Sequence, residues 1–246
     1  MRKKPVESFV MTVDGVRISI RHEKIQRKAA VIIAPGYFQS KLTRTFKGLA
    51  LDIEKYFDVV SMDFRGHGRS RGFYTFSARE KQDLRAVAEY ARARYEKVGV
   101  LGFSLGGSIA ILEQAEYGNL DSLICVGSPM DFRKVEFKKW WHPEAWKVAL
   151  KGLECGAGAR FGNPFLRKVR PIDAVGLVSP TPILFIHGSK DPTVNVRHSL
   201  MLFEAARDPK DLQIFYEGSH AEEIYRQHRD EFVKVVIDWF RKTLGE

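Results

Sequence analysis

Short apolar runs alternate along the chain with longer stretches in which apolar residues recur at helical spacing. The run AAVIIA at 29–34 is apolar throughout, as is typical of a strand buried on both faces of a sheet. In the stretch 79–95, residues such as Leu84, Val87 and Ala91 fall on one face of a helix. This alternation predicts an α/β fold with a mostly parallel central sheet and helices on both of its faces.

The same pattern sets the order of the expected elements. Strands are expected at 29–34, 57–64, 97–103, 120–127, 181–188 and 212–218. Helices are expected at 44–56, 79–95 and 105–117, between the last two strands, and at 222–243. Two further β-type runs flank Asp14-Gly15, which predicts a hairpin near the start of the chain. In such sheets the reactive groups lie just past the carboxyl ends of the strands.

The interval 128–178 breaks the alternation. About 50 residues separate two expected strands there, which is too long for a simple connection. The interval is rich in aromatic residues, among them Trp140, Trp141 and Trp146. We interpret it as a small helical cap or lid inserted into a single α/β domain that spans residues 1–246.

Composition narrows the class of protein. Of the 246 residues, 44% are hydrophobic and 28% are charged, which excludes a disordered tail, a disulfide scaffold and a collagen-like repeat. The formal net charge is +10. Residues 1–28 carry a net +5 and residues 131–171 a net +6, so the rest of the chain is close to neutral.

Three interpretations of the basic, aromatic segment stay open. Its aromatic residues could pack on the sheet while its basic side chains are solvated. It could receive an apolar acyl chain beneath and an anionic headgroup above. It could contact a membrane surface or a nucleic acid, since basic residues interleaved with aromatic ones occur in single-strand binders. No nucleic-acid fold signature accompanies the segment, so we expect no nucleic-acid partner.

The start of the chain bears on the compartment. The basic opening MRKKPVESFV is not followed by an apolar run of signal-peptide length, and no run approaches the length of a membrane span. We therefore expect a cytoplasmic protein without a transmembrane segment. A disulfide between the two cysteines, Cys125 and Cys155, is not expected there. The sequence does not decide whether the protein forms a homo-oligomer.

The run GFSLGG at 102–107 carries the strongest chemical signal. It follows an expected strand and opens an expected helix, which is the context that the G-x-S-x-G motif requires. The glycines allow a strained turn that exposes the hydroxyl of Ser104. The helix that begins there points its free N–H groups at any negative charge that develops. Ser104 is therefore the candidate nucleophile.

With this motif the chain resembles the α/β-hydrolase family over nearly its whole length. The run DFRGHGRS at 63–70, the run DPTV at 191–194 and the late His220 match that family in type and order. The resemblance implies an α/β-hydrolase fold and a serine, acid and histidine in that chain order. A serine at the elbow argues against dehalogenases and epoxide hydrolases, in which relatives have aspartate.

A serine nucleophile needs a base, and seven histidines compete for this role. His220 directly follows the last expected strand and is the candidate base. We expect His187 to be a packed residue at a strand end and His67 to make structural hydrogen bonds. The remaining four are expected to be ordinary surface residues, namely His22, His142, His198 and His228.

The candidate acid is Asp191, which follows the run ILFIHG by a short turn and stands where the family most often has its acid. Asp131 is the second candidate, because it follows the preceding strand and some relatives use that position. Asp63 is expected to be structural and to hold its glycine-rich loop. The alternative for Asp191 is a turn-capping role, since Asp-Pro often starts turns.

An oxyanion hole should consist of two backbone N–H groups. We expect one from Leu105, next to the nucleophile, and one from Tyr37, which follows the glycine of the loop after the strand at 29–34. Many relatives have histidine before that glycine, where this chain has Pro35. The candidate pocket residues are Phe38, Phe103, Met130, Trp140, Trp141 and Trp146.

These residues predict a serine esterase that acts on small-molecule esters with small to medium acyl chains. A thioesterase and an amide or acyl-peptide hydrolase of the same fold are the alternatives within the enzyme class. A non-catalytic binding module with this fold is the alternative from another class, although no triad member is missing. We expect no metal and no cofactor, because neither zinc-ligand spacings nor nucleotide-binding motifs occur in the sequence.

Overall fold

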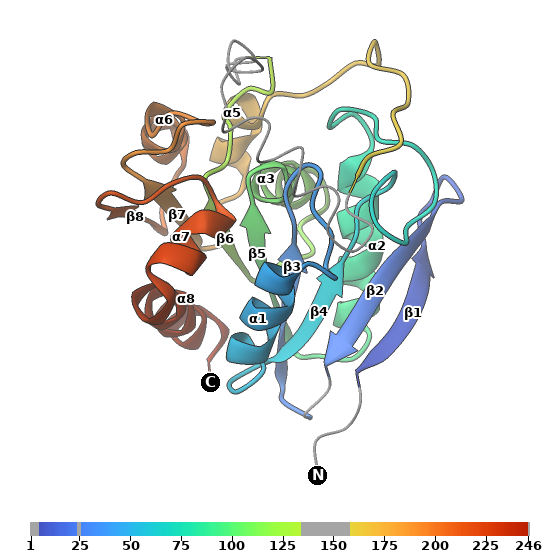
Figure 1. Ribbon diagram of the computed structural model, residues 1–246, viewed down its shortest axis with the longest axis horizontal. Coiled ribbons are helices and arrows are strands. Elements are labelled where there is room, and N and C mark those ends of the chain that lie inside the picture. Colours follow the sequence, from blue (N-terminus) through green and yellow to red (C-terminus); the bar gives the residue numbers. More distant parts are fainter. Residues whose placement is uncertain (1–4, 24–25, 134–157, 246) are drawn as a thin grey trace.

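The computed structural model describes residues 5–23, 26–133 and 158–245, and eight strands in this part of the chain form one sheet (Figure 1). The order of the strands across the sheet is β1-β2-β4-β3-β5-β6-β7-β8. Their bounds are β1 Val6–Met11, β2 Arg17–Glu23, β3 Ala29–Ala34, β4 Asp58–Met62, β5 Lys97–Phe103, β6 Ser122–Val126, β7 Ile183–Gly188 and β8 Lys210–Phe215.

The sheet is mixed but mostly parallel, as the sequence predicts. Strands β1 and β2 form the expected antiparallel hairpin, with Met11 opposite Arg17 and Gly15 at φ +78° in the turn. Strand β2 also pairs antiparallel with β4, whereas every pair from β4 to β8 is parallel. The carboxyl ends of β3 to β8 therefore meet at one edge of the sheet.

Helices cover both faces of this sheet (Figure 1). On one face α1, α7 and α8 bury apolar side chains, and on the other face α2, α3, α5 and α6 do so. Their bounds are α1 Arg44–Ile53, α2 Glu80–Arg92, α3 Leu105–Tyr117, α5 Pro171–Ala174, the 3₁₀ helix η2 Val175–Leu177, α6 Arg197–Ala205, α7 Glu222–Gln227 and α8 Arg229–Leu244. None of the helices in the described ranges is long and apolar enough to cross a membrane.

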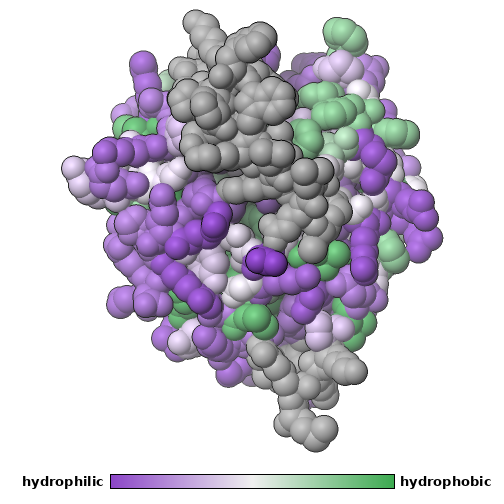
Figure 2. Space-filling model, in the orientation of Figure 1, coloured by the Kyte–Doolittle hydropathy of each residue, from purple (hydrophilic) through white to green (hydrophobic). Residues whose placement is uncertain are grey.

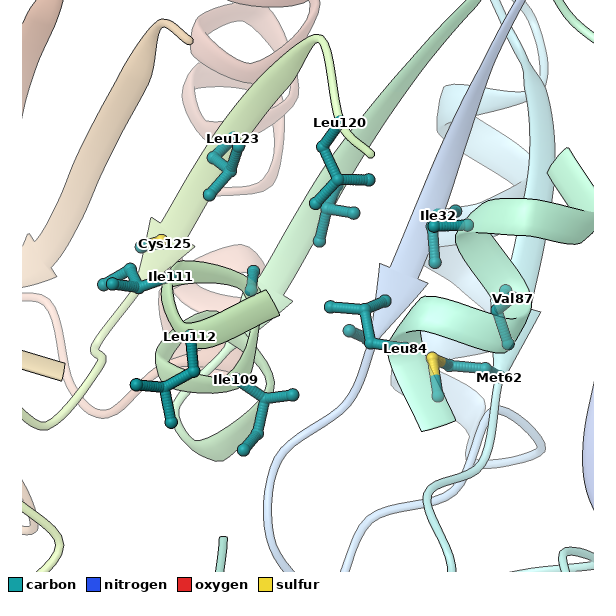
Figure 3. Packing of buried hydrophobic residues seen from close by; sticks show 14 of the residues in the cluster. Ile32, Met62, Leu84, Val87, Ile109, Ile111, Leu112, Leu120, Leu123 and Cys125 are labelled. Carbon is teal, nitrogen blue, oxygen red and sulfur yellow. The ribbon is translucent and has the colours of Figure 1, made fainter. Parts of the chain in front are cut away.

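The close-up of the core in Figure 3 shows how the helical and strand patterns meet. Ile111 of α3 lies beside Cys125 of β6, and Leu84 of α2 lies beside Met62 of β4. Cys125 is a free thiol, and its burial raises its pKa. The apolar faces predicted from sequence periodicity are thus the faces that these helices bury.

The structure corrects the expected C-terminal helix at 222–243. Two helices, α7 and α8, occupy this stretch, and His228 between them is non-helical with φ −128° and ψ 48°. The N–H of His228 donates to the carbonyl of Ile224 in α7, and its carbonyl accepts the N–H of Phe232 in α8, both at 2.8 Å, so one helix ends and the next begins at this residue.

The interval predicted to be a cap, 128–178, is described in two parts, and residues 134–157 lie outside the described residues. Residues 171–178 belong to the helical layer against α3 rather than to a cap, because Ala174, Val175 and Val178 are buried in the core. Residues 159–162 instead run along the loop that follows β4. There the N–H of Tyr74 donates to the carbonyl of Arg160 at 2.8 Å.

Candidate active site

Ser104 stands on a sharp turn between β5 and α3, as the motif predicts. Its backbone has φ 49° and ψ −109°, a conformation that is strained for any residue other than glycine. Its N–H donates to the carbonyl of Val126 on β6 at 2.7 Å. The neighbouring glycines are required by space: a Cβ on Gly106 would lie 2.2 Å from the carbonyl oxygen of Ala34, and one on Gly102 would lie 2.5 Å from Gly107.

Asp191 and His220 are brought together at the same edge of the sheet. Nδ1 of His220 lies 2.6 Å from Oδ2 of Asp191, and the Asp191 side chain is fully buried. The other oxygen, Oδ1, accepts the backbone N–H groups of Thr193 and Val194, both at 2.8 Å. The loop after β7 therefore holds this carboxylate with one oxygen and presents the other to His220.

The electrostatics favour an ionised Asp191. Burial by itself would raise the pKa of its carboxyl group. The attraction of His220 and the hydrogen bonds from His187 and His220 outweigh burial and hold that pKa well below its usual range. A charged carboxylate beside an imidazole fixes the tautomer with a proton on Nδ1, which leaves Nε2 to accept a proton.

Close backbone contacts join the segments that carry Ser104 and His220. A Cβ on Gly127, just after β6, would lie 3.1 Å from the nitrogen of Ala221, so the residue after His220 touches the end of β6. Ser104 is bonded to the same strand end through Val126. The elbow and the histidine loop thus flank one strand end.

The loop after β3 lies against the elbow. A Cβ on Gly36 would approach the Cβ of Ser104 to 3.5 Å. The side chain of Gln39 donates from Nε2 to Oε1 of Glu222 on α7 at 2.7 Å, which ties this loop to the helix after His220. Within residues 5–23, 26–133 and 158–245, the N–H groups of Tyr37 and Leu105 have no acceptor. They are free to donate to a bound group.

A cluster of aromatic rings lies beside this loop. Tyr37 stacks at a tilt against Tyr74 with ring centroids 5.1 Å apart, and Phe38 meets the edge of Phe161 at 6.0 Å. Phe38 has φ +61°, which is uncommon for a residue with a bulky side chain. Phe161 is 52% exposed. Figure 2 shows hydrophobic residues gathered at the surface where segment 158–170 passes the loop after β4.

The other pocket candidates have different positions. Phe103 is a correction: its side chain is fully buried between Phe46 and Phe232, on the face covered by α1 and α8, so it is a core residue and does not line a pocket. Met130 is buried, and its N–H donates to Nδ1 of His198 at 3.1 Å. The three tryptophans, Trp140, Trp141 and Trp146, lie outside the described residues.

Among the described residues, the second candidate acid, Asp131, pairs with an arginine and not with a histidine. Both carboxylate oxygens of Asp131 accept hydrogen bonds from the guanidinium of Arg133, at 3.2 and 3.0 Å. Beside this ion pair lies a cavity of about 360 Å³ that is lined mainly by residues 131–133 and 166–170. Between the two acids, the geometry therefore favours Asp191.

Two of the seven histidines have the structural roles expected of them. His187 is a buried residue at the end of β7, and His67 lies with Nδ1 3.0 Å from the carbonyl oxygen of Arg65. Burial lowers the pKa of His67 to about 4. His22 and His198 were expected on the surface, but both are buried and hydrogen-bonded. Their partners come from distant segments, so local sequence could not identify them.

Asp63 holds its loop as expected, and it also has a partner that the sequence did not indicate. Its Oδ2 accepts the N–H of Arg69 at 3.0 Å and pairs with Nζ of Lys41 at 2.7 Å. The Lys41 side chain is fully buried, which is rare for lysine unless its charge is paired. This ion pair joins the glycine-rich loop to the loop that contains Tyr37.

Fold and site together define the class of protein as an α/β-hydrolase with a serine at the nucleophile elbow. Residues 25–153 match the model of the family described as serine aminopeptidase, S33. This match covers more than half of the chain, and the chain belongs to that family.

Characterised and uncharacterised relatives are similar at low identity. The chain is 24% identical over 196 residues to the uncharacterized protein YfhR of Escherichia coli K12, covering 78% of this chain and 63% of that relative. It thus spans less than two thirds of that relative's length. It is also 24% identical over 274 residues to the serine hydrolase BPHL of Mus musculus, covering 97% of this chain and 90% of the relative.

Solved structures with the same fold include esterases. The Pyrococcus furiosus esterase Pf2001 is similar with a TM-score of 0.80 at 20% identity, covering 98% of this chain and 93% of that one. The esterase EaEST from Exiguobacterium antarcticum has a TM-score of 0.75 at 19% identity, covering 96% and 100%. At these identities the likeness establishes the fold.

Proposed function

We propose that this protein is a serine esterase in which Ser104 is the nucleophile, His220 the general base and Asp191 the acid that orients His220. The observation that carries the proposal is the 2.6 Å contact between His220 Nδ1 and Asp191 Oδ2, at the sheet edge where the strained elbow stands. An imidazole oriented in this way through Nδ1 has the tautomer in which Nε2 can act as the general base for a serine hydroxyl.

Acylation follows from these roles. Nε2 of His220 takes the proton of the Ser104 hydroxyl as its oxygen bonds to the ester carbonyl carbon. The carbonyl oxygen becomes an oxyanion, and the backbone N–H groups of Tyr37 and Leu105 donate to it. When the tetrahedral intermediate collapses, the bond to the alcohol breaks and His220 gives its proton to the departing oxygen.

Deacylation repeats the sequence with water as the nucleophile. His220 takes a proton from the water, the hydroxide oxygen bonds to the acyl carbon, and Ser104 leaves with the proton returned by His220. Asp191 stays ionised throughout and stabilises the imidazolium. Losing one oxyanion-hole donor typically costs about 2.7–4 kcal/mol in the barrier.

We propose small-molecule esters with small to medium acyl chains as the substrates. Apolar rings flank the loop that carries the oxyanion donor, with Phe38 and Phe161 partly exposed. Such rings suit an apolar acyl or alcohol group. The similar solved structures from Pyrococcus furiosus and Exiguobacterium antarcticum are esterases, which supports this choice.

Ser104→Ala tests the proposal. We expect the variant to lose hydrolysis of a p-nitrophenyl ester and labelling by a fluorophosphonate, while its circular dichroism spectrum is unchanged. Ser179→Ala is the matched control, because Ser179 lies before β7 at the opposite edge of the sheet, with its hydroxyl bonded to the carbonyl of Asp208. Full activity in Ser104→Ala would refute the assignment.

The alternatives are separated by a panel of substrates with one acyl group in common. An oxygen ester, a coenzyme A thioester and an anilide of butyrate differ only in the leaving group. A kcat/KM highest for the ester supports the esterase, whereas a preference for the thioester or the anilide points to the corresponding hydrolase. No turnover and no labelling of wild-type Ser104 would indicate a non-catalytic binding module.

A further inference from the structure

His187 is the penultimate residue of β7, and its side chain is fully buried. Its Nε2 lies 2.8 Å from the carbonyl oxygen of Val194 and 3.3 Å from Oδ2 of Asp191. Its Nδ1 lies 2.6 Å from the hydroxyl of Ser199 on α6. The imidazole therefore spans from α6 to the carboxylate that contacts His220.

The partners of the ring decide its tautomer. A carbonyl and a carboxylate oxygen face Nε2 and both can only accept, so Nε2 carries the proton. In the neutral ring Nδ1 is then an acceptor, and the hydroxyl of Ser199 donates to it. One N–H is thus shared between Val194 and Asp191.

Oδ2 of Asp191 consequently faces two imidazoles, at 2.6 Å from His220 and 3.3 Å from His187. Oδ1 is held by the N–H groups of Thr193 and Val194. The backbone of Val194 links His187 to the other carboxylate oxygen, because its N–H donates to Oδ1 of Asp191 and its carbonyl accepts from His187. The rotamer of Asp191 is therefore set from both sides.

We propose that His187 is a positioning residue, which holds Oδ2 of Asp191 and the turn around Val194 in place so that the carboxylate meets Nδ1 of His220. This role rests on the proposed function, since it acts through the Asp191–His220 pair. His187 does not touch substrate in this proposal. It limits the freedom of the buried carboxylate and shares the oxygen that orients the base.

Two amide substitutions separate the role of Nε2 from that of Nδ1. In His187→Gln the amide nitrogen reaches the Nε2 position and can donate to Asp191. In His187→Asn the amide is one methylene shorter, so it stays near Ser199 and withdraws the donor from Asp191. Both variants are polar and smaller than or similar in size to histidine, so a general loss of packing affects both.

We expect His187→Asn to lower kcat for a p-nitrophenyl ester by about 10- to 100-fold with little change in KM, because small misplacements of catalytic groups cost rates of this order. The rate is expressed per site labelled by fluorophosphonate, which removes any unfolded fraction. The acid limb of the kcat/KM profile, which reports the protonation of His220, should move by about half a pH unit or more, since the donors on Asp191 have changed. His187→Gln should restore most of the rate.

His22→Asn is the matched control for the loss of a buried histidine. His22 on β2 lies with Nδ1 3.0 Å from the Tyr90 hydroxyl and Nε2 2.5 Å from that of Tyr95, away from the β7 and β8 end of the sheet. We expect this control to lower the melting temperature while the acid limb and the rate per labelled site stay at the wild-type values.

The proposal would be overturned if His187→Asn has the same rate per labelled site and the same acid limb as the wild type. It would also be overturned if the rate per labelled site of His187→Gln is no higher than that of His187→Asn. If His187→Asn does not fold, Ser199→Ala takes its place, because it frees the ring at Nδ1; an unchanged rate there would also overturn the role. Failure of the proposed function is distinct, since it would show as activity in Ser104→Ala.

Discussion

Glu113 lies in the last turns of α3, the helix that begins after Ser104, and it offers a test of how burial affects a carboxyl group in this fold. Its side chain is fully buried, and its Oε1 accepts from the amide of Asn119 at 3.0 Å. Its Oε2 is buried with no hydrogen-bond partner among the described residues. Burial raises the pKa of Glu113 from 4.5 to about 7, with smaller opposing effects from Asn119 and nearby arginines.

The sign of the pH dependence follows from this shift. The folded protein favours the neutral carboxyl, so the contribution of Glu113 to stability is fully present below pH 4.5 and is lost as the pH rises through about 7. Since one pKa unit corresponds to about 1.4 kcal/mol, the shift of about 2.5 units amounts to an upper value of about 3 kcal/mol. Above pH 8 the wild-type protein bears this whole cost.

Glu113→Gln removes the charge and keeps an oxygen for Asn119. Urea denaturation at pH 5 should give similar free energies of unfolding for variant and wild type. At pH 8.5 we expect the variant to be more stable by about 2–3 kcal/mol, because only the wild type then carries the buried charge.

Glu116→Gln is the matched control on the same helix. The pKa of Glu116 is lowered, because although burial raises it, the ion pair with Lys81 lowers it further. The sign is therefore opposite, and this variant should be slightly destabilised at pH 8.5. A difference between Glu113→Gln and wild type that is the same at both pH values would refute the reasoning.

Two further substitutions test how the site is held. Lys41→Met removes the cation from its ion pair with Asp63, in which both side chains are fully buried. We expect urea denaturation to show a free energy of unfolding lower by about 3–5 kcal/mol, and adding Asp63→Asn should recover part of this loss. A loss below about 1 kcal/mol would contradict this account. Gly106→Ala places a Cβ 2.2 Å from the Ala34 oxygen, so fluorophosphonate labelling should be lost. Gly176→Ala, whose nearest contact would be 3.4 Å, should label normally; equal labelling of both would contradict the requirement for glycine at 106.

The fold could be predicted from the sequence because apolar runs and turn motifs are each contained in a few neighbouring residues. The apolar run at 29–34 can only be buried on both faces, and it forms a central strand. The run GFSLGG predicted the elbow, since a serine at φ 49° with no room for a side chain at Gly102 or Gly106 leaves few alternatives. The pairing of Asp191 with His220 followed from their places after β7 and β8, which are adjacent parallel strands.

Other features depend on contacts between segments far apart in the chain. Phe103 is a core residue because α1 and α8 cover the face of the sheet on which its side chain lies. The strand KVGVLGF is apolar on both faces, so its sequence does not indicate which helices cover which face. His198 lies in α6 among both polar and apolar residues, and the packing of the loop after β6 against this helix makes its Nδ1 a buried acceptor for the N–H of Met130.

The net charge of +10 can be counted from the sequence, whereas the ion pairs that the basic side chains form are visible only in the structure. The sequence located part of it in residues 131–171, and among the described residues there Arg133 is paired with Asp131, and Arg170 with Asp173 just beyond. Both partners of each pair are already counted in the +10, so the pairs leave the net charge unchanged and show only that two of these basic side chains lie beside carboxylates.

By itself, the sequence predicted the order of strands and helices and the turn that carries Ser104, because periodicity and turn chemistry act over a few residues. The chain order of the candidate triad was predicted from the resemblance to the α/β-hydrolase family. The tertiary structure decided that Lys41 is buried beside Asp63 and that His187 shares an oxygen of Asp191 with His220. Each of these contacts joins side chains whose burial and orientation are set by the packing of whole elements, which no short stretch of sequence contains.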